Sequence, residues 1–391
     1  MNLNVHIETL IIALVLGHFF SGILGIAYMI QRKRDITVYT FLFSRLFETV
    51  AWILIGLRNI IHSFISISIG NSFLIIGATL QIVAFLTIKN CCTNIVKRFY
   101  VISTIISICI FNLVSLFYNM ESMRISVISI IMTILWFFPI YVLLSDKNSS
   151  VLQRVIAVLY GVEMALLIFR AYIGIVLDES TSLMSRSIYN VLFFLCLYLI
   201  MLMGNIGLIL MAKEKSDFDL INAATYDELT NIFNRRTFLL HAKESILLLS
   251  RRKEPISFFL IDVDNFKKIN DIHGHFSGDM VLKDFATIIK SQLRDYDLFG
   301  RFGGEEFTVL LPGTNEKEAL EVAEKLRKIT EDASVSVSTN HTIKYTISIG
   351  IVTVIPEEST SIDTLYKLSD NALYMAKRNG RNRIEIVKTK K

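Results

Sequence analysis

RFGGEEFTVLLP, residues 301–312, is the stretch from which the fold of the C-terminal half is predicted. A Gly-Gly pair separates LFGRF (298–302) from the apolar run that follows the two glutamates, and a two-residue spacing of this kind is typical of a β-hairpin. We expect the run after the glutamates to be buried. Because strand side chains alternate, we expect Glu305 and Glu306 to face opposite ways and to serve different roles.

Strand and helix patterns surround this hairpin. The aromatic run ISFFLIDVD (256–264) predicts a buried strand, and TIKYTISIGIVTV (342–354) predicts another, with a bulge at Gly350. A last strand is expected at 382–387. Amphipathic or helix-like patterns predict three helices, at 275–294, at 315–332 and at 361–380, the last ended by Gly380. These elements indicate an α+β or α/β domain of about 165 residues, enough for one core.

Acidic and basic side chains accompany these elements. Asp262 and Asp264 close the apolar strand on one face, with Val263 on the other, and buried carboxylates need a cation or hydrogen bonds. Lys377 and Arg381 lie four residues apart, which predicts one helix face offering cations to phosphate oxygens.

The hairpin glycines complete the pattern. Gly303 and Gly304 can adopt positive φ and leave room for a bulky ligand over the turn. An acid set for Mg²⁺, a glycine turn and two cations together fit phosphoryl or nucleotidyl transfer, although each feature alone is more often a solvated face or a simple hairpin.

The C-terminal half resembles the GGDEF family, the diguanylate cyclases. The resemblance rests on GGEEF (303–307), YDELTNIFNRR (226–236), DVDNFKKINDIHGHFSGDMVL (262–282) and NALYMAKRNGRNR (371–383), in order and without large gaps. It implies a palm-like α+β nucleotidyl-cyclase domain at 226–391 with a mainly antiparallel central sheet.

This resemblance implies the chemistry as well. Two GTP molecules are joined into cyclic di-GMP with release of two pyrophosphates. Mg²⁺, for which Mn²⁺ can substitute, is assigned to Asp262, Glu306 and the Val263 carbonyl, and Glu305 helps to deprotonate the attacking ribose 3′-hydroxyl. The remaining assignments bind GTP: Asn270 and Asp279 at the guanine edge, Phe266 and Lys267 through backbone amides, Gly303 and Gly304 at the turn, and Lys377 and Arg381 by charge.

A regulatory site and a dimer are also implied. RDYD (294–297) places Arg294 and Asp297 at the family's RxxD spacing, where the product cyclic di-GMP inhibits turnover; the alternative is a helix-end salt bridge. An arginine found in some members corresponds here to Lys325, so the strength of inhibition stays open. Each domain binds one GTP, so two copies must meet face to face as a homodimer, and no nucleic-acid polymer is implied.

The N-terminal half is apolar and poor in charge. Of the 391 residues 53% are hydrophobic, and residues 1–212 hold 13 Lys+Arg and 8 Asp+Glu, whereas residues 213–391 hold 27 of each. The four cysteines all lie in the apolar half without metal-ligand spacing, so neither a disulfide framework nor a metal site is indicated. Seven apolar segments of membrane-spanning length are predicted, at about 8–30, 37–57, 64–88, 98–118, 124–144, 153–177 and 187–211.

The charges in the loops predict an orientation. The first, third and fifth loops and the chain after the last segment carry the clustered Lys and Arg, whereas the alternate loops carry single arginines. The positive-inside rule then places the N-terminus outside and the C-terminal domain in the cytoplasm, in a multi-pass protein of the bacterial cytoplasmic (inner) membrane, bound by its lipid bilayer. We therefore expect a sensory domain at 1–211 made of an all-α bundle of seven helices, and a helical connector at 212–225.

Ionisable residues inside the expected spans leave two interpretations open. Arg45, Glu48, Glu163 and Arg170 either line a ligand-sensing pocket or pair with one another to fix helix packing, and His18 is more consistent with a structural role than with metal binding. The connector transmits a rotation or a dimer geometry, or is a plain tether. The signal itself cannot be read from the sequence.

Three functions are compatible with this organisation. The favoured one is a membrane-bound diguanylate cyclase regulated by its membrane domain and by product. A second is a catalytically silent receptor for GTP or cyclic di-GMP, which usually lacks one of the acids or Lys377, and all of these are present. A third, a transporter or channel, is disfavoured because no internal repeat is evident and Pro139 is the only proline in this half.

Overall fold

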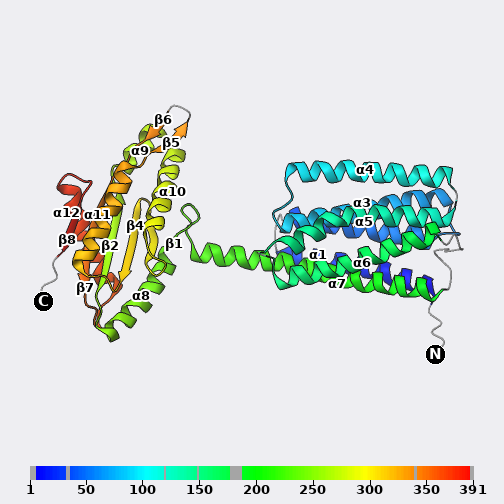
Figure 1. Ribbon diagram of the computed structural model, residues 1–391, viewed down its shortest axis with the longest axis horizontal. Coiled ribbons are helices and arrows are strands. Elements are labelled where there is room, and N and C mark those ends of the chain that lie inside the picture. Colours follow the sequence, from blue (N-terminus) through cyan, green and yellow to red (C-terminus); the bar gives the residue numbers. More distant parts are fainter. Residues whose placement is uncertain are drawn as a thin grey trace. The chain divides into compact units, whose positions relative to one another are not determined.

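The computed structural model describes residues 6–31, 36–118, 120–147, 149–176, 187–338 and 341–387. The chain divides into two compact units, Met1–Ser216 and Asp217–Lys391. The first is a bundle of helices and the second is a sheet flanked by helices (Figure 1).

The first unit confirms the seven predicted helices. Each is long and apolar enough to cross a membrane, judged by length and composition. Their bounds are α1 Ile7–Gln31, α2 Ile36–Gly56, α3 Gly70–Ile88 preceded by the π-helical segment η1 Phe64–Ile69, α4 Asn94–Phe117, α5 Glu121–Ser145, α6 Val151–Val176 and α7 Ile188–Thr225. The last helix extends past the predicted end of its apolar segment, through the residues expected to form a connector.

Polarity in this unit is the reverse of that in a soluble bundle. The Arg45 side chain is buried, with 1% of the residue exposed, while apolar residues such as Ile105 on α4 are 58% exposed. Ionisable groups within the helices, such as Arg45, Glu48 and Arg170, therefore face inward, while many aliphatic groups face outward. This arrangement suits a hydrocarbon surrounding, since a surface this apolar is rare on monomeric soluble proteins.

The second unit contains eight strands and five complete helices within its described residues. The strands are β1 Phe233–Asn234, β2 Ile256–Val263, β3 Leu298–Gly303, β4 Glu306–Pro312, β5 Val335–Ser338, β6 His341–Ile343, β7 Ile347–Val354 and β8 Ile384–Val387. The helices are α8 Arg235–Arg252, α9 Phe266–His273, α10 His275–Gln292, α11 Glu316–Asp332 and α12 Ile362–Arg378.

The main sheet has the order β1-β3-β4-β2-β7-β8. The pairings β3 with β4, β4 with β2 and β2 with β7 are antiparallel, whereas the two edge pairings are parallel. The prediction of a mainly antiparallel sheet is thus confirmed, as is the hairpin. Strand β2 is central and buried at every position, because helices cover both faces.

Alternation along β2 assigns its two faces. Phe258 and Leu260 join a core cluster with residues of α8 and α12, whereas Phe259, Ile261 and Val263 join a cluster with residues of α10 and α11. Continuing the first series, Asp262 lies on the face of α12.

Two details of the predicted strand at 342–354 are wrong. It is two strands, β6 and β7, and the register between β2 and β7 runs without a shift past Gly350, so there is no bulge in this described pairing. Glycine is required there because α12 crosses closely. A Cβ at Gly350 would collide with the Ser369 carbonyl and the Leu373 amide.

Four described elements of this unit were not predicted: β1, α8, α9 and β5. A signal for α8 was available in the sequence. Asn234 accepts a hydrogen bond from the Thr237 N–H as an N-cap, and the buried Phe238, Ala242 and Ile246 recur every fourth residue.

Replacing Gly350 with alanine is expected to destabilise the second unit by about 1–3 kcal/mol, because backbone atoms of α12 cannot move aside like a flexible side chain. Hydrogen exchange of the intact chain should show faster exchange in β7 and α12. Gly303→Ala is the control, since a Cβ there meets no described atom within 4 Å. Equal protection in both variants would contradict the close-packing explanation.

Candidate active site

The GGEEF hairpin separates its two glutamates differently from the sequence expectation. Glu306 is the first residue of β4, whereas Glu305 lies in the turn and not on a strand. Gly304, also in the turn, has φ +49°. The alternation of strand side chains therefore does not apply to Glu305. The two acids are distinguished by their places on turn and strand.

Arg301 braces this turn, a role that the sequence analysis missed. Its Nε and one terminal nitrogen donate to the Gly304 carbonyl at 3.0 and 2.7 Å, and the other terminal nitrogen donates to Asp227 Oδ1 at 3.0 Å. Asp227 also accepts from the backbone N–H and hydroxyl of Thr230. Burial acts to raise the pKa of Asp227, but the hydrogen bonds from Thr230 and Arg301 hold it below its ordinary value.

Asp262 and Glu306 are cross-strand neighbours. They occupy opposed positions of the antiparallel pair β2–β4, so both carboxylates project from the same face of the sheet. Lys377 of α12 forms an ion pair with Asp262, with 2.7 Å between Nζ and Oδ2. Burial raises the pKa of Asp262 to about 6; Lys377 opposes this rise, and the charges of Glu305 and Glu306 add to it. The fold thus brings these four predicted residues together.

Asp264, grouped with Asp262 in the sequence analysis, has a different setting. Its carboxylate accepts hydrogen bonds from the hydroxyls of Ser348 at 2.6 Å and Thr346 at 2.7 Å, and from the backbone N–H of Asn382 at 2.9 Å. These bonds tie the start of β7 and the loop after α12 to the end of β2. Asp264 therefore stabilises the fold locally.

A metal would be held by few protein ligands. Within the described ranges, no group of three or more His, Cys, Asp or Glu residues is arranged to hold an ion. Asp262 and Glu306 are two adjacent carboxylates, and Mg²⁺ commonly binds one or two carboxylates together with substrate phosphates. The donor set fits a cation that arrives with a nucleotide. The Val263 carbonyl is the third predicted ligand; the Val263 N–H donates to the Glu305 carbonyl at 3.4 Å.

Tyr366 of α12 is a second group that the sequence analysis missed. Its hydroxyl hydrogen-bonds to Glu306, and its ring stacks on Phe302 with centroids 5.5 Å apart. The guanidinium carbon of Arg235 lies 5.3 Å from the centroid of the Phe302 ring. Burial and the neighbouring Glu306 charge raise the pKa of Tyr366, so it remains a donor to Glu306. In the sequence it is indistinguishable from a core residue of an amphipathic helix.

The residues predicted to bind the base and phosphates lie on α9 and α10. Asn270 is on α9, and its buried Oδ1 has no hydrogen-bond partner among the described residues. Gly278 of α10 lies against it, and a Cβ at that position would collide with this oxygen. Asp279 is exposed on α10. Phe266 and Lys267 begin α9, which has no side-chain cap in the described structure, so first-turn amides can meet an anion.

Arg381 is not on the helix face predicted for it. Helix α12 ends at Arg378, and Gly380 follows with φ +120°. The Arg381 N–H donates to the Ala376 carbonyl at 3.0 Å, which is the longer bond of a Schellman C-cap. The chain therefore turns before Arg381, and only Lys377 is presented by the helix.

The RDYD segment forms a closed turn. Asp297 Oδ2 accepts from the Arg294 N–H at 2.9 Å, while the Arg294 guanidinium donates to the Tyr296 hydroxyl at 2.9 Å. The alternative of a helix-end salt bridge is therefore wrong, since the carboxylate caps backbone. The buried Asp297 Oδ1 has no hydrogen-bond partner in the described chain. Burial raises the pKa of Asp297, opposed by the Arg294 N–H and charge.

Comparison with known proteins finds relatives of the second unit. Residues 224–383 match the family "Diguanylate cyclase, GGDEF domain". "Diguanylate cyclase A" of Treponema denticola is 38% identical over 172 residues, covering 43% of this chain and 46% of that protein. "Probable diguanylate cyclase DgcT" of Escherichia coli is 41% identical over 167 residues, covering 42% and 36%. The chain thus spans less than half the length of these curated relatives.

A solved structure covers the same region. The active GGEEF domain of a diguanylate cyclase from Vibrio cholerae is 35% identical, covers 40% of this chain and 98% of its own, and superposes with a TM-score of 0.37. The sequence matches show that residues 224–383 are similar to the GGDEF domain of diguanylate cyclases.

The acid cluster predicts a pH dependence. Because the pKa of Asp262 is raised to about 6, its carboxylate takes up a proton as the pH falls through that value, and binding of Mg²⁺ with a non-hydrolysable GTP analogue should weaken. Lys377 opposes the rise, so Lys377→Met should move the midpoint of this loss to higher pH. Equilibrium binding measured from about pH 5 to about pH 8, a range that spans this pKa, checks the shift. A midpoint unchanged in the variant would contradict the Asp262–Lys377 coupling.

Proposed function

We propose that this protein is a membrane-bound diguanylate cyclase that condenses two GTP into cyclic di-GMP and two pyrophosphates. The observation that carries the proposal is the register of β2 and β4, which sets Asp262 opposite Glu306, beside a turn that holds Glu305. The completeness of this acid set, together with Lys377, favours the enzyme over the silent receptor.

Each residue then has one task in the reaction. Bound Mg²⁺ would supply positive charge to the phosphates, held by Asp262, Glu306 and the Val263 carbonyl. Glu305 accepts the proton of a ribose 3′-hydroxyl, whose oxygen forms a bond to the α-phosphorus of the other GTP while the bond from that phosphorus to the β-phosphate oxygen breaks. Pyrophosphate leaves with the electron pair, and a second identical step closes the ring.

The remaining residues bind and orient GTP. Asn270 and Asp279 meet the guanine edge, and the orphan Asn270 Oδ1 is an acceptor that a base can satisfy. Phe266 and Lys267 offer backbone amides, while Lys377 and Arg381 bind the phosphates. Nothing within 4 Å in the described chain would meet a Cβ at Gly303 or Gly304, which leaves the space over the turn for substrate.

Two copies of the domain are required because each holds one GTP. We propose a homodimer in the bacterial cytoplasmic membrane, with the N-terminus outside and the GGDEF domain in the cytoplasm. A signal at the membrane domain would act through α7, which is continuous from Ile188 to Thr225. Product would inhibit at Arg294 and Asp297, with Lys325 as a weaker third contact.

Substitution of Glu305 by glutamine is expected to lower turnover by roughly 100- to 10,000-fold, because the amide cannot accept the proton, while GTP binding is retained. Cyclic di-GMP production and nucleotide binding by the intact protein measure the two effects. Glu321→Gln, an exposed change on α11, is the matched control. Turnover that survives Glu305→Gln would remove Glu305 from the role of base.

Substitution of Arg294 by alanine is expected to relieve product inhibition, raising the half-inhibitory cyclic di-GMP concentration by about tenfold or more, because a guanidinium fork is lost. Initial rates at increasing product concentration test this. Arg251→Ala, at the exposed end of α8, removes the same charge elsewhere. Unchanged inhibition would exclude RDYD as the regulatory site.

A further inference from the structure

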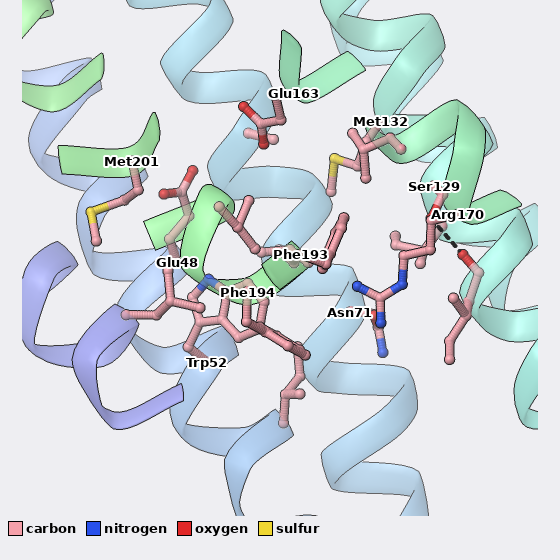
Figure 2. Close-up of a pocket in the computed structure, with 18 of the residues that line it drawn as sticks. Glu48, Trp52, Asn71, Ser129, Met132, Glu163, Arg170, Phe193, Phe194 and Met201 are labelled. Atoms are coloured by element: carbon pink, nitrogen blue, oxygen red, sulfur yellow. Dashed lines mark hydrogen bonds between the residues drawn. The ribbon is translucent and has the colours of Figure 1, made fainter. Parts of the chain in front are cut away.

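We infer that the cavity inside the helical unit is a binding site for a small organic carboxylate with an apolar ring, anchored by Arg170. The cavity lies between helices of the bundle, and Figure 2 shows Arg170, Glu163 and the aromatic side chains around it. Its volume is about 150 Å³. A cavity of that size in another protein accommodates benzene, so a compact ring fits the space.

The walls suit a flat apolar body. Trp52, Trp136, Tyr160, Phe193 and Phe194 all line the cavity. Trp136 and Tyr160 stack with centroids 4.1 Å apart, and Trp52 and Phe194 meet edge to face at 6.1 Å. Rings fixed in this way present preformed faces and edges to a ligand ring.

Arg170 is the feature that specifies an anion. The residue is 7% exposed, and its guanidinium carbon lies 4.0 Å from the Phe193 ring centroid and 5.4 Å from that of Phe194. No described residue forms a hydrogen bond or an ion pair with it, and the acid whose charge acts on it, Glu121, is already paired with Arg58. Arginine keeps its charge in proteins, and burying an unpaired charge costs several kcal/mol. Aromatic faces offset only part of that cost, and the proposed ligand supplies the carboxylate that the described residues do not.

Arg45, Glu48 and Arg58 at the cavity, unlike Arg170, form ion pairs within the chain. Arg45 pairs with Glu48 at 2.9 Å, and Glu48 also lies 3.0 Å from His18. Arg58 pairs with Glu121 at 2.7 Å. Arg124 also lines the cavity and has an interaction of its own, so the anion site is not assigned to it.

Glu163 is the one acid of α6 that faces the same cavity. It lies seven residues from Arg170, about 10 Å along the helix axis, which is too far for an ion pair. Unlike arginine, a glutamate in hydrocarbon can become neutral by taking up a proton. Arg170 is therefore the group that requires a ligand.

A ligand in this cavity would contact α7, the helix that leads out of the first unit. Arg170 lies on α6, while Phe193 and Phe194 lie on α7, so a ligand bound between them contacts the helix that continues to Thr225. Control of cyclic di-GMP synthesis by this ligand rests on the proposed function, whereas binding itself does not.

The two tryptophans of the chain, Trp52 and Trp136, both line the cavity, so intrinsic fluorescence reports on it directly. Benzoate is the probe, added to the intact protein in lipid nanodiscs, and benzamide is its neutral counterpart. We expect a saturable fluorescence change with benzoate and none with benzamide. Arg170→Gln should abolish the response, and Arg170→Lys should weaken binding by about tenfold or more, since lysine lacks the fork.

Arg154→Gln is the matched control, because it removes an exposed arginine from the same helix. It should bind benzoate like the unaltered protein. A missing saturable response in the unaltered protein, or equal binding by the Arg170→Lys variant, would overturn the site; the lysine variant decides the matter if the glutamine variant does not fold. Cyclic di-GMP production in the same samples separates the hypotheses. Benzoate binding without any cyclase activity would contradict the proposed function while leaving the binding site intact.

Discussion

A carboxylate at the end of a strand buried on both faces is the constraint on which the second unit depends. Burial of β2 extends to Asp262, which is 5% exposed, and an ionised carboxylate there requires a cation. Lys377 supplies one from α12, so the acid also fixes where that helix ends relative to the sheet. The register between β2 and β4 then places Glu306 opposite it, and Arg301 holds the turn that precedes Glu306. Stability and proposed chemistry thus use the same atoms.

The acid cluster carries more negative than positive charge by itself. Three neighbouring acids with one lysine make a site that is short of positive charge, as the raised pKa of Asp262 records. A metal and a nucleotide would relieve this imbalance together. The carboxylates of Asp262 and Glu306 are too few protein ligands to bind a cation strongly without the phosphates. We therefore propose that the cation and the nucleotide bind together, with the cation entering alongside the phosphates.

Local patterns predicted the hairpin, the central strand and the three amphipathic helices, because alternation and capping depend on near neighbours. Contacts between distant segments were not predictable. The sequence Asp262-Val263-Asp264 presents two similar acids, and only Ser348, Thr346 and Asn382 distinguish the structural one. The contact of Gly350 with α12 and the bond from Arg301 to Asp227 likewise join segments far apart in the chain. In the first unit, hydropathy located the helices but did not distinguish Arg45 from Arg170. In the structure Arg45 pairs with Glu48, whereas Arg170 lies against the Phe193 ring.

The central claim is that the acid cluster joins two GTP molecules. Its most direct test is to incubate the intact protein in lipid nanodiscs with GTP and Mg²⁺ and to identify the products by mass spectrometry with a pyrophosphate assay. We expect cyclic di-GMP, with two pyrophosphates for each molecule formed. GDP and phosphate as the only products, or unchanged GTP at protein concentrations high enough for dimers to form, would contradict it.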